Sequence, residues 1–222
     1  MNEEKSMSGS TESKASAGSI AKFFQSNGKG DVLADAFNGS NGAESRTDGE
    51  SSNGELVRLV LDSTAEGLYG IDLEGNCTFA NTACAKMLGF DDPSELLGKQ
   101  MHELVHHTRP DGTPYPVEEC HIYRAFRERK GTHVDDEIMF CSDGVAFPVE
   151  YWSYPVERNG EQVGCVVTFM DITERRDAEA QKREADDLVR LLLDSTAEGI
   201  YGIDLEGNCT FANPASAKLL GV

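Results

Sequence analysis

Residues 56–90 read LVRLVLDSTAEGLYGIDLEGNCTFANTACAKMLGF, a segment that recurs at residues 188–222 as LVRLLLDSTAEGIYGIDLEGNCTFANPASAKLLGV. The two copies are identical at 29 of 35 positions and are offset by 132 residues. This period is far longer than the roughly 20 to 50 residues of solenoid repeats, so each copy is expected to be a separate globular module. The sequence therefore predicts a complete module at residues 56–176 and the start of a second at residues 188–222.

Alternating apolar residues and turn signals divide the complete copy into short strands and helices. Strands are expected at residues 68–72, 77–81, 132–141, 146–157 and 162–171. Helices are expected at residues 82–88, 93–97, 100–107 and 117–129, and Gly67 is expected to end a helix that starts at Leu56. Because the helices separate the first two strands from three strands joined by hairpins, the pattern predicts an α+β fold, an antiparallel sheet with helices on one side.

Several of these motifs resemble the PAS family of sensory modules with its C-terminal PAC region. The resemblance rests on Glu66 to Asn76 with Asn81, on Leu88-Gly89-Phe90, on Asp143-Gly144, and on Gly164 with the run FMDITERR at residues 169–176. It implies a five-stranded antiparallel sheet flanked by helices, a small internal pocket, and a role in sensing or in relaying a signal to an effector. The family does not identify the ligand, so the cofactor is left unknown.

The pocket residues follow from strand alternation and from similarity to the family. Alternation places Tyr69 and Ile71 on one face of their strand and Thr78 with Ala80 on one face of the next. By similarity to the family, these faces line the cavity, together with side chains from other elements: Cys84, Tyr123, Phe126, Val149 and Tyr151. The alternative is that these side chains only fill the core.

A group of histidines and cysteines suggests a metal site. His102 and His106 have the i, i+4 spacing that places two residues on one helical face, and Cys120 and His121 follow at the next predicted helix. Imidazole and thiolate ligands suit Zn²⁺ or a haem iron. Neighbouring residues diverge by about 100° around a helix, so at most one of Cys120 and His121 is expected to join the two histidines. No acidic partner for these histidines can be chosen from the sequence, and ordinary surface or core histidines remain the alternative.

Other features restrict the function. The formal net charge of −19 disfavours binding to nucleic acid or to anionic lipid. No run of 18 apolar residues and no signal peptide are seen, and the six cysteines form no CxxC pair, so we expect a cytoplasmic protein without a membrane segment. Residues 1–55 contain 11 Ser and 8 Gly, a composition typical of a disordered tail.

The sequence carries no familiar catalytic motif. It lacks a nucleophile elbow, a phosphate-binding loop and a zinc-protease helix, so an enzymatic activity of this chain is not expected. Gly75 to Phe79 looks like a flavin-adduct motif but lies in the opening hairpin, which is the wrong place for one. The acids Asp135, Asp136 and Glu137 are interpreted as a charged strand edge that discourages aggregation.

A connector helix is expected at residues 174–196, directly after the last strand of the complete copy. Asp171, Ile172 and Thr173 join the strand to this helix, and Thr173 is expected to cap it. Five residues recur along it at spacings of three and four and form one stripe: Ala178, Gln181, Ala185, Leu188 and Leu192. The helix is interpreted as a signal transmitter, and an inert linker is the alternative.

These observations lead to one functional hypothesis and two alternatives. The chain is expected to be a sensor or relay module of a larger signalling protein, of the histidine kinase or diguanylate cyclase type, with a downstream output domain. It would act as a homodimer, bind a small molecule and transmit through the helix. The alternatives are a dimerisation module without a ligand, and a metal or haem sensor that uses His102, His106 and Cys120.

Overall fold

The computed structural model describes residues 59–221 and divides the chain into two compact units, with the boundary between Ile172 and Thr173. The tail predicted for residues 1–55 lies outside the described residues, as does the start of the helix predicted at Leu56. No helix within residues 59–221 is both long enough and apolar enough to cross a bilayer.

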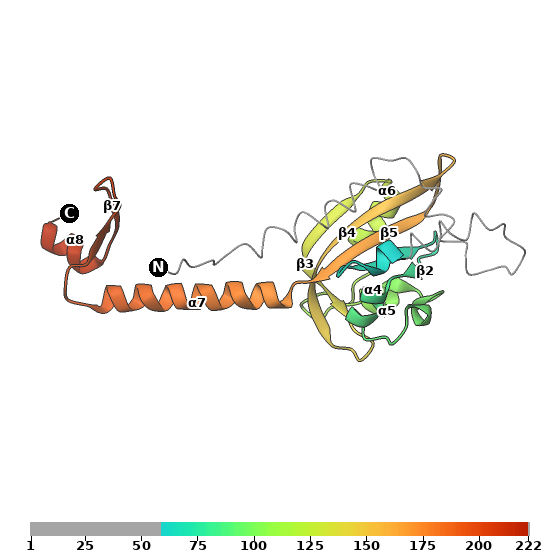
Figure 1. Cartoon of the computed structure of the whole chain (residues 1–222), viewed down its shortest axis with the longest axis horizontal. Coiled ribbons are helices and arrows are strands. Elements are labelled where there is room, and N and C mark those ends of the chain that lie inside the picture. Colours follow the sequence, from blue (N-terminus) through green and yellow to red (C-terminus); the bar gives the residue numbers. More distant parts are fainter. Residues whose placement is uncertain (1–58, 222) are drawn as a thin grey trace, which may run out of the picture. The chain divides into compact units, whose positions relative to one another are not determined.

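The first unit is built on a five-stranded antiparallel sheet (Figure 1). Its strands are β1 (Gly67–Ile71), β2 (Cys77–Ala80), β3 (Thr132–Phe140), β4 (Ala146–Arg158) and β5 (Glu161–Asp171). Their order across the sheet is β2-β1-β5-β4-β3, and every neighbouring pair is antiparallel. The sheet places β5, the strand that leads out of the unit, at its centre. The predicted α+β fold with a five-stranded antiparallel sheet is confirmed.

Short helices connect β2 to β3 and pack on one face of the sheet. They are α4 (Thr82–Met87), the 3₁₀ helix η1 (Pro93–Leu96), α5 (Met101–Val105) and α6 (His121–Glu128). Buried residues from these helices and from the strands form one continuous hydrophobic core, which includes Tyr69, Leu88, Val105 and Tyr151. A smaller cluster that includes Leu61, Leu68 and Val166 lies apart from it.

Helix α6 is shorter than the sequence pattern predicts. It was expected to start at residue 117, but residues 117–119 form a turn in which the Glu119 amide donates to the Pro116 carbonyl and the Cys120 amide to that of Val117. Cys120 then has an extended ψ of 127° and stands immediately before the first helical residue, His121. The turn therefore separates Cys120 from the regular helix and lets its side chain point away from it.

Gly67 starts a strand instead of ending a helix. The described part of the preceding helix ends at residue 62, and Gly67 is the first residue of β1. A Cβ atom at this position would lie 2.3 Å from Cζ of Phe169. Glycine is required here because the aromatic ring of β5 lies directly against the backbone of β1, not because a left-handed cap is needed.

Asn81 joins the opening helix, β1 and α4 through its side chain. Oδ1 accepts from the backbone amides of Leu68 and Cys84, each at 2.9 Å, so Asn81 is the N-cap of α4. Nδ2 donates to the carbonyls of Leu61 and Glu66, each at 2.9 Å. All four bonds are local in space but span up to 20 residues of sequence, so one buried side chain fixes three elements.

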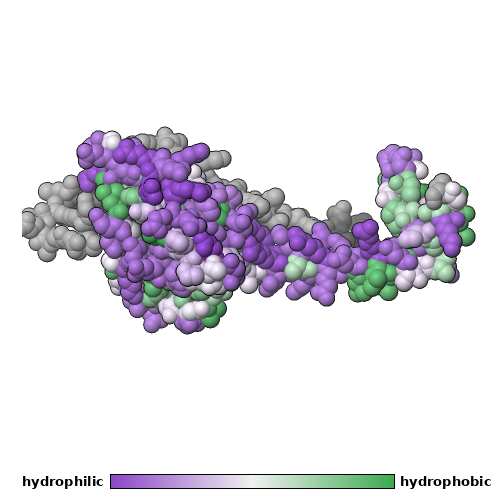
Figure 2. All heavy atoms as spheres, turned by 180° about the vertical axis from the view of Figure 1, so that it is seen from behind, coloured by the Kyte–Doolittle hydropathy of each residue, from purple (hydrophilic) through white to green (hydrophobic). Residues whose placement is uncertain are grey.

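The second unit contains the connector helix and the second copy of the repeat. Its elements are α7 (Thr173–Ser195), β6 (Tyr201–Ile203), β7 (Cys209–Ala212) and α8 (Pro214–Leu220), and β6 pairs with β7. The side chains of α7 are not buried in the structure. Figure 2 shows an apolar patch near the C-terminal end of this otherwise hydrophilic helix, where Leu188, Leu191 and Leu192 are more than half exposed.

Candidate functional site

A cavity of about 170 Å³ lies in the first unit, between the sheet and helices α5 and α6. Most of its wall is apolar and comes from Tyr69, Ile71, Met101, Val117, Ile122 and Tyr123. One side is different, because His102, His106 and Cys120 also line it. Glu74 and Gln100 add polar side chains to the lining, so the cavity combines apolar walls with a few polar groups, as small-molecule sites commonly do.

The predicted pocket residues are divided between this cavity and the core. Tyr69, Ile71 and Tyr123 line the cavity. The core contains the other predicted residues except Thr78, with Cys84, Val149 and Tyr151 fully buried and Ala80 and Phe126 partly buried against them.

Thr78 differs from its expected position because of a β-bulge. The register between β1 and β2 shifts after Gly70, so that Tyr69 lies opposite Ala80 while Ile71 lies opposite Cys77. Simple alternation would pair Thr78 with Ala80 on the inner face, but a bulge breaks that alternation. Cys77, which is 3% exposed, takes the place in the core instead.

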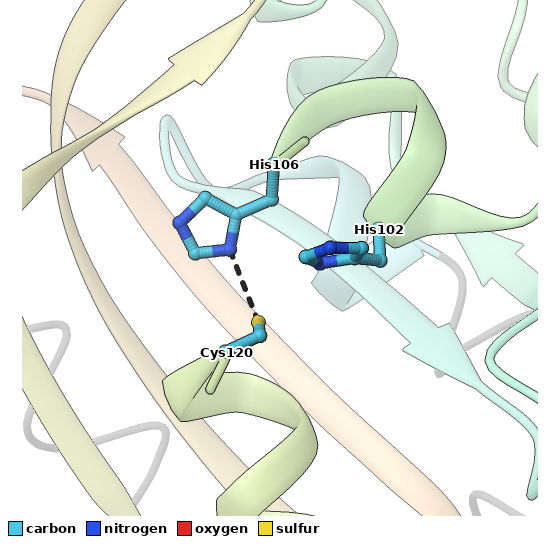
Figure 3. Close-up of side chains that lie close together, drawn as sticks. All are labelled: His102, His106 and Cys120. Atoms are coloured by element: carbon cyan, nitrogen blue, oxygen red, sulfur yellow. Dashed lines mark hydrogen bonds between the residues drawn. The ribbon is translucent and has the colours of Figure 1, made fainter. Parts of the chain in front are cut away.

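His102, His106 and Cys120 lie together at the edge of the cavity. Each offers one ligand atom, and these atoms are all within 4.8 Å of one another. Figure 3 shows the two imidazole rings and the thiol pointing toward a common point, with His106 Nδ1 at 3.3 Å from Cys120 Sγ. His102 is on α5, His106 stands at its C-terminal end, and Cys120 precedes α6. His121 is outside this group, in line with the expectation that only one of the two adjacent residues would join it.

The remaining ring nitrogens of the two histidines also have defined surroundings. His102 Nε2 lies 2.8 Å from the backbone carbonyl of Tyr115, which can only accept a hydrogen bond. That contact places the proton of a neutral His102 on Nε2 and leaves a lone pair on Nδ1, which is buried without a hydrogen-bond partner among the described residues. His106 Nε2 lies 2.8 Å from Oε2 of Glu137.

Glu137 is the centre of a buried polar network. Its carboxylate contacts His106 at 2.8 Å and His121 at 2.6 Å, and it accepts hydrogen bonds from the hydroxyls of Tyr115 at 2.9 Å and Tyr151 at 2.6 Å. The interpretation of Asp135, Asp136 and Glu137 as an exposed charged edge is therefore wrong for Glu137, whose side chain is 12% exposed.

A second bulge explains why Glu137 points inward. Val134 lies opposite Tyr151 and Glu137 opposite Val149, so Asp135 and Asp136 together lie opposite the single residue Glu150, and β3 has one extra residue relative to its partner β4. Such a bulge re-aims the side chain that follows it. Sequence reasoning missed Glu137 because three consecutive acids give no sign of which one turns toward the core.

The network sets the protonation of the site. Burial by itself would raise the pKa of the Cys120 thiol, but the neighbouring imidazoles of His102 and His106 outweigh burial and lower that pKa to about 6. Burial likewise opposes the charge on His106, yet Cys120 and Glu137 together raise its pKa to about 9. The Glu137 pKa falls to about 2, since the contact with His106 outweighs desolvation. At neutral pH the site thus holds a thiolate, an imidazolium and a carboxylate in a row.

Two packing contacts connect the site to the central strand β5. Tyr151, which donates to Glu137, lies opposite Phe169 in the β4–β5 register. Tyr69, which lines the cavity, makes an edge contact with the Phe169 ring at a centroid distance of 6.0 Å. Three residues further along, Ile172 is 3% exposed and its amide donates to the Pro148 carbonyl at 3.0 Å. The chain then enters α7 at Thr173, which is the first helical residue and not the cap position expected from the sequence.

Comparison with known families gives two matches. Residues 65–174 match a family model described as a PAS domain. Residues 187–222 match a second model with the same description. The matches coincide with the complete copy of the repeat and with the start of the second copy.

Two relatives from Escherichia coli K12 are similar to this chain. It is 30% identical to the probable diguanylate cyclase DgcE over 123 residues. This aligned region covers 55% of this chain and 11% of DgcE. It is 27% identical to the signal transduction histidine-protein kinase AtoS over 142 residues. This aligned region covers 61% of this chain and 21% of AtoS. The chain thus spans only a small part of the length of either relative.

A solved structure is also similar. It is the PAS domain of a protein from Colwellia psychrerythraea, with 18% sequence identity and a TM-score of 0.44 over 54% of this chain and 97% of that one.

Proposed function

Because the chain belongs to the PAS domain family of signalling sensors, we propose that its complete copy binds a small molecule in the 170 Å³ cavity and relays this binding through α7. The observation that carries the proposal is the position of this cavity. It borders Tyr69, which packs on Phe169, and Phe169 lies four residues before the start of α7.

The size and lining of the cavity favour a small ligand. A cavity volume of about 170 Å³ is small for a protein–ligand site. Sites for drug-sized ligands run from about 300 to 1,000 Å³, so a flavin or a haem would require the core to open. We therefore propose a ligand of a few heavy atoms, with an apolar part against Tyr69 and Ile71 and a donor group toward the histidines.

The relay is proposed to run through Asp171, Ile172 and Thr173. Ile172 is anchored in the first unit by burial and by its bond to Pro148. A shift of Phe169 along β5 would therefore move Ile172 and the first turn of α7 together. A continuous helix of 23 residues is stiff enough to carry such a displacement to whatever follows it.

The output is proposed to belong to a larger protein of which this chain is a part. Relatives with the same module are a probable diguanylate cyclase and a histidine kinase, and both are several times longer than the aligned region. A kinase or cyclase output downstream of the module is therefore proposed. Homodimerisation through α7 is proposed on the basis of the exposed residues Leu188, Leu191 and Leu192.

A module that dimerises without any ligand is the second candidate. The same exposed leucines favour it, since an apolar helical face in water is stabilised by pairing with another copy. The two candidates differ in whether binding of a ligand in the cavity changes the conformation of α7.

Occupancy of the cavity can be tested by native mass spectrometry of the full chain. Val117 lines the cavity and lies in a turn, so Val117→Trp would fill the space. Val145, 58% exposed in the turn between β3 and β4, provides the matched Val145→Trp control. The proposal expects an organic mass excess in the wild type and in Val145→Trp that denaturation removes, and no excess in Val117→Trp. A wild-type spectrum with protein mass alone would favour the ligand-free candidate.

A further inference from the structure

We propose that His102, His106 and Cys120 bind one zinc ion through His102 Nδ1, His106 Nδ1 and Cys120 Sγ, with release of the proton held between His106 Nδ1 and Cys120 Sγ and with the fourth coordination position open to the cavity. This inference deepens the proposed function, since it assigns the donor side of the same cavity to a metal.

The first observation is the choice of donors. Two imidazoles and one thiolate are the ligands that zinc takes in proteins, whereas magnesium and calcium require oxygen ligands. The three side chains come from two different elements, α5 with its C-terminal end and the turn before α6, and converge from both (Figure 3). They are buried or half-buried, which limits competition from bulk water.

The second observation concerns the nitrogens that would not touch the metal. Histidines bound to zinc almost always donate their other N–H to a carbonyl or a carboxylate, which fixes the tautomer and the ring orientation. Here His102 Nε2 is held by the Tyr115 carbonyl at 2.8 Å, and His106 Nε2 by the Glu137 carboxylate at 2.8 Å. Both rings are therefore held by partners of the kind that zinc-bound histidines use.

The unpartnered nitrogen of His102 provides independent support. Its Nδ1 is buried and makes no hydrogen bond to any described residue. A buried lone pair without a partner is destabilising, so such atoms in a folded protein call for an explanation. A metal ion bound at Nδ1 supplies one.

The distances fit a tetrahedral ion after a small movement. With zinc–nitrogen and zinc–sulfur distances of about 2.0 to 2.3 Å, ligand atoms of a tetrahedral site lie about 3.3 to 3.6 Å apart. His106 Nδ1 and Cys120 Sγ are already 3.3 Å apart. The ligand atoms of all three residues lie within 4.8 Å of one another, so a rotation that moves His102 by about 1 Å completes the geometry.

The open fourth coordination position is where a ligand in the cavity would bind to the zinc ion. Structural zinc sites have four protein ligands, but sites with three protein ligands keep one position for water or a small molecule. All three residues line the cavity, so a ligand with a nitrogen, oxygen or sulfur donor could replace the water on zinc while its apolar part contacts Tyr69 and Ile71. The metal would give the small cavity both affinity and selectivity.

The test is stoichiometric metal binding by the full chain. Exposed Cys209 is first replaced by Ser so that it does not compete for metal. Titration with Zn²⁺ against a chromogenic chelator should give one ion per chain, and Co²⁺ should give the thiolate charge-transfer band of a cobalt–sulfur bond. His106→Ala and Cys120→Ser should each weaken Zn²⁺ binding by about 100-fold or more, since changes outside the ligand set already cost about 10- to 100-fold. The charge-transfer band should disappear in Cys120→Ser.

Matched controls separate the site from general effects. His107→Gln replaces an exposed histidine next to His106, and Cys141→Ser replaces a partly buried cysteine outside the cluster, so both should keep wild-type affinity. Glu137→Gln should bind one ion with about 10- to 100-fold lower affinity, as expected for a positioning residue. Circular dichroism of each metal-free variant verifies that the fold is kept, and Cys120→Ala replaces any Cys120→Ser protein that fails to fold.

Two results would overturn the inference. One is binding of less than one Zn²⁺ per wild-type chain in the chelator competition, and the other is wild-type affinity in His106→Ala or Cys120→Ser. Either result would leave the organic mass excess, and its loss in Val117→Trp, unaffected. Failure of the metal site and failure of the small-molecule proposal are therefore distinguishable.

Discussion

Glu137 and His106 meet inside the first unit, where Oε2 of the carboxylate lies 2.8 Å from Nε2 of the imidazole. The contact joins strand β3 to the end of helix α5, two elements that are more than 25 residues apart in sequence. Both side chains are largely withdrawn from water, at 12% and 2% exposure. A charged pair in this position is strong only while both partners are present.

The first prediction follows from this pair. Glu137→Gln keeps the shape of the side chain but removes the charge that His106, His121 and two tyrosine hydroxyls contact. We expect the free energy of unfolding of the metal-free chain to fall by about 2 kcal/mol, the scale of a hydrogen bond to a charged group. Urea denaturation measures this. Asp136→Asn, the same chemical change at an exposed neighbour, should stay within about 0.5 kcal/mol of wild type.

Much of the fold was accessible from the sequence because its signals are local. The pairs Asp143-Gly144 and Asn159-Gly160 predict tight hairpin turns, and Gly144, Asn159 and Gly160 all have positive φ. Asn81 has the side chain of a helix cap, and it caps α4. In β4, alternation puts Phe147, Val149 and Tyr151 on one face of the strand, and all three are in the core.

The features that could not be predicted depend on tertiary register. Thr78 and Glu137 each follow a shift in strand pairing, and a bulge reverses which side chains face inward without leaving a mark in the composition. Gly67 was assigned to a helix end because its close contact with Phe169 involves a residue about 100 positions away. His102 and His106 were grouped correctly from helical spacing, but their partners Tyr115 and Glu137 come from other elements.

The repeat shows how strongly burial depends on context. Tyr69 and Ile71 are 1% and 6% exposed, while the equivalent Tyr201 and Ile203 in the second copy are 62% and 63% exposed. The local sequence and the hairpin are the same in both copies. What differs is the covering by β5 and by the helices after α4, which only the first copy supplies among the described residues, whereas α8 of the second copy corresponds to α4.

The second prediction uses the repeat as its own control. Asn81→Ala removes four hydrogen bonds that join three elements of the first unit, and we expect it to lower the free energy of unfolding of that unit by about 3 kcal/mol. Asn213 makes the equivalent bonds in the second unit, to Leu193, Glu198, Ile200 and Ser216. Trp152 is in β4, so its fluorescence reports on the first unit. Thermal unfolding followed by this fluorescence should therefore be unchanged in Asn213→Ala. An equal loss of stability of the first unit in Asn81→Ala and Asn213→Ala would contradict the role assigned to Asn81.

The third prediction is a loss of stability in alkali. Burial raises the pKa of Cys165 from 9.0 to about 12 in the folded chain. Between these values the unfolded chain releases the thiol proton while the folded chain keeps it, so stability falls as pH rises above 9. By pH 10 this thiol should cost about 1.4 kcal/mol relative to pH 7.

The measurement is urea denaturation at pH 7 and pH 10. Cys165→Ala should be less stable than wild type at both values but should lose about 1.4 kcal/mol less between them. Cys209→Ala, which changes an exposed cysteine, should lose as much as wild type. If Cys165→Ala and wild type show the same pH dependence, the buried thiol is not the cause.

The fourth prediction concerns the apolar face of α7. Leu188 and Leu192 are one turn apart and are 55% and 58% exposed, so pairing with a second copy would bury both. Replacing both with Glu should convert a dimer to a monomer in sedimentation velocity experiments. Lys182→Glu changes the helix charge by the same amount at a position without an apolar side chain and should leave the dimer intact. A wild-type monomer at all concentrations would remove the basis for dimerisation through α7.

The central claim is that the state of the cavity is transmitted to α7, and hydrogen–deuterium exchange tests it most directly. Exchange would be followed in peptides that cover residues 166–180 of the full chain, for wild type, Val117→Trp and Val145→Trp. Filling the cavity should displace Tyr69 against Phe169, and we expect Val117→Trp to change the exchange rates of Phe169 to Arg176 several-fold while Val145→Trp leaves them unchanged. Identical exchange in all three proteins would contradict the claim that cavity and helix are coupled.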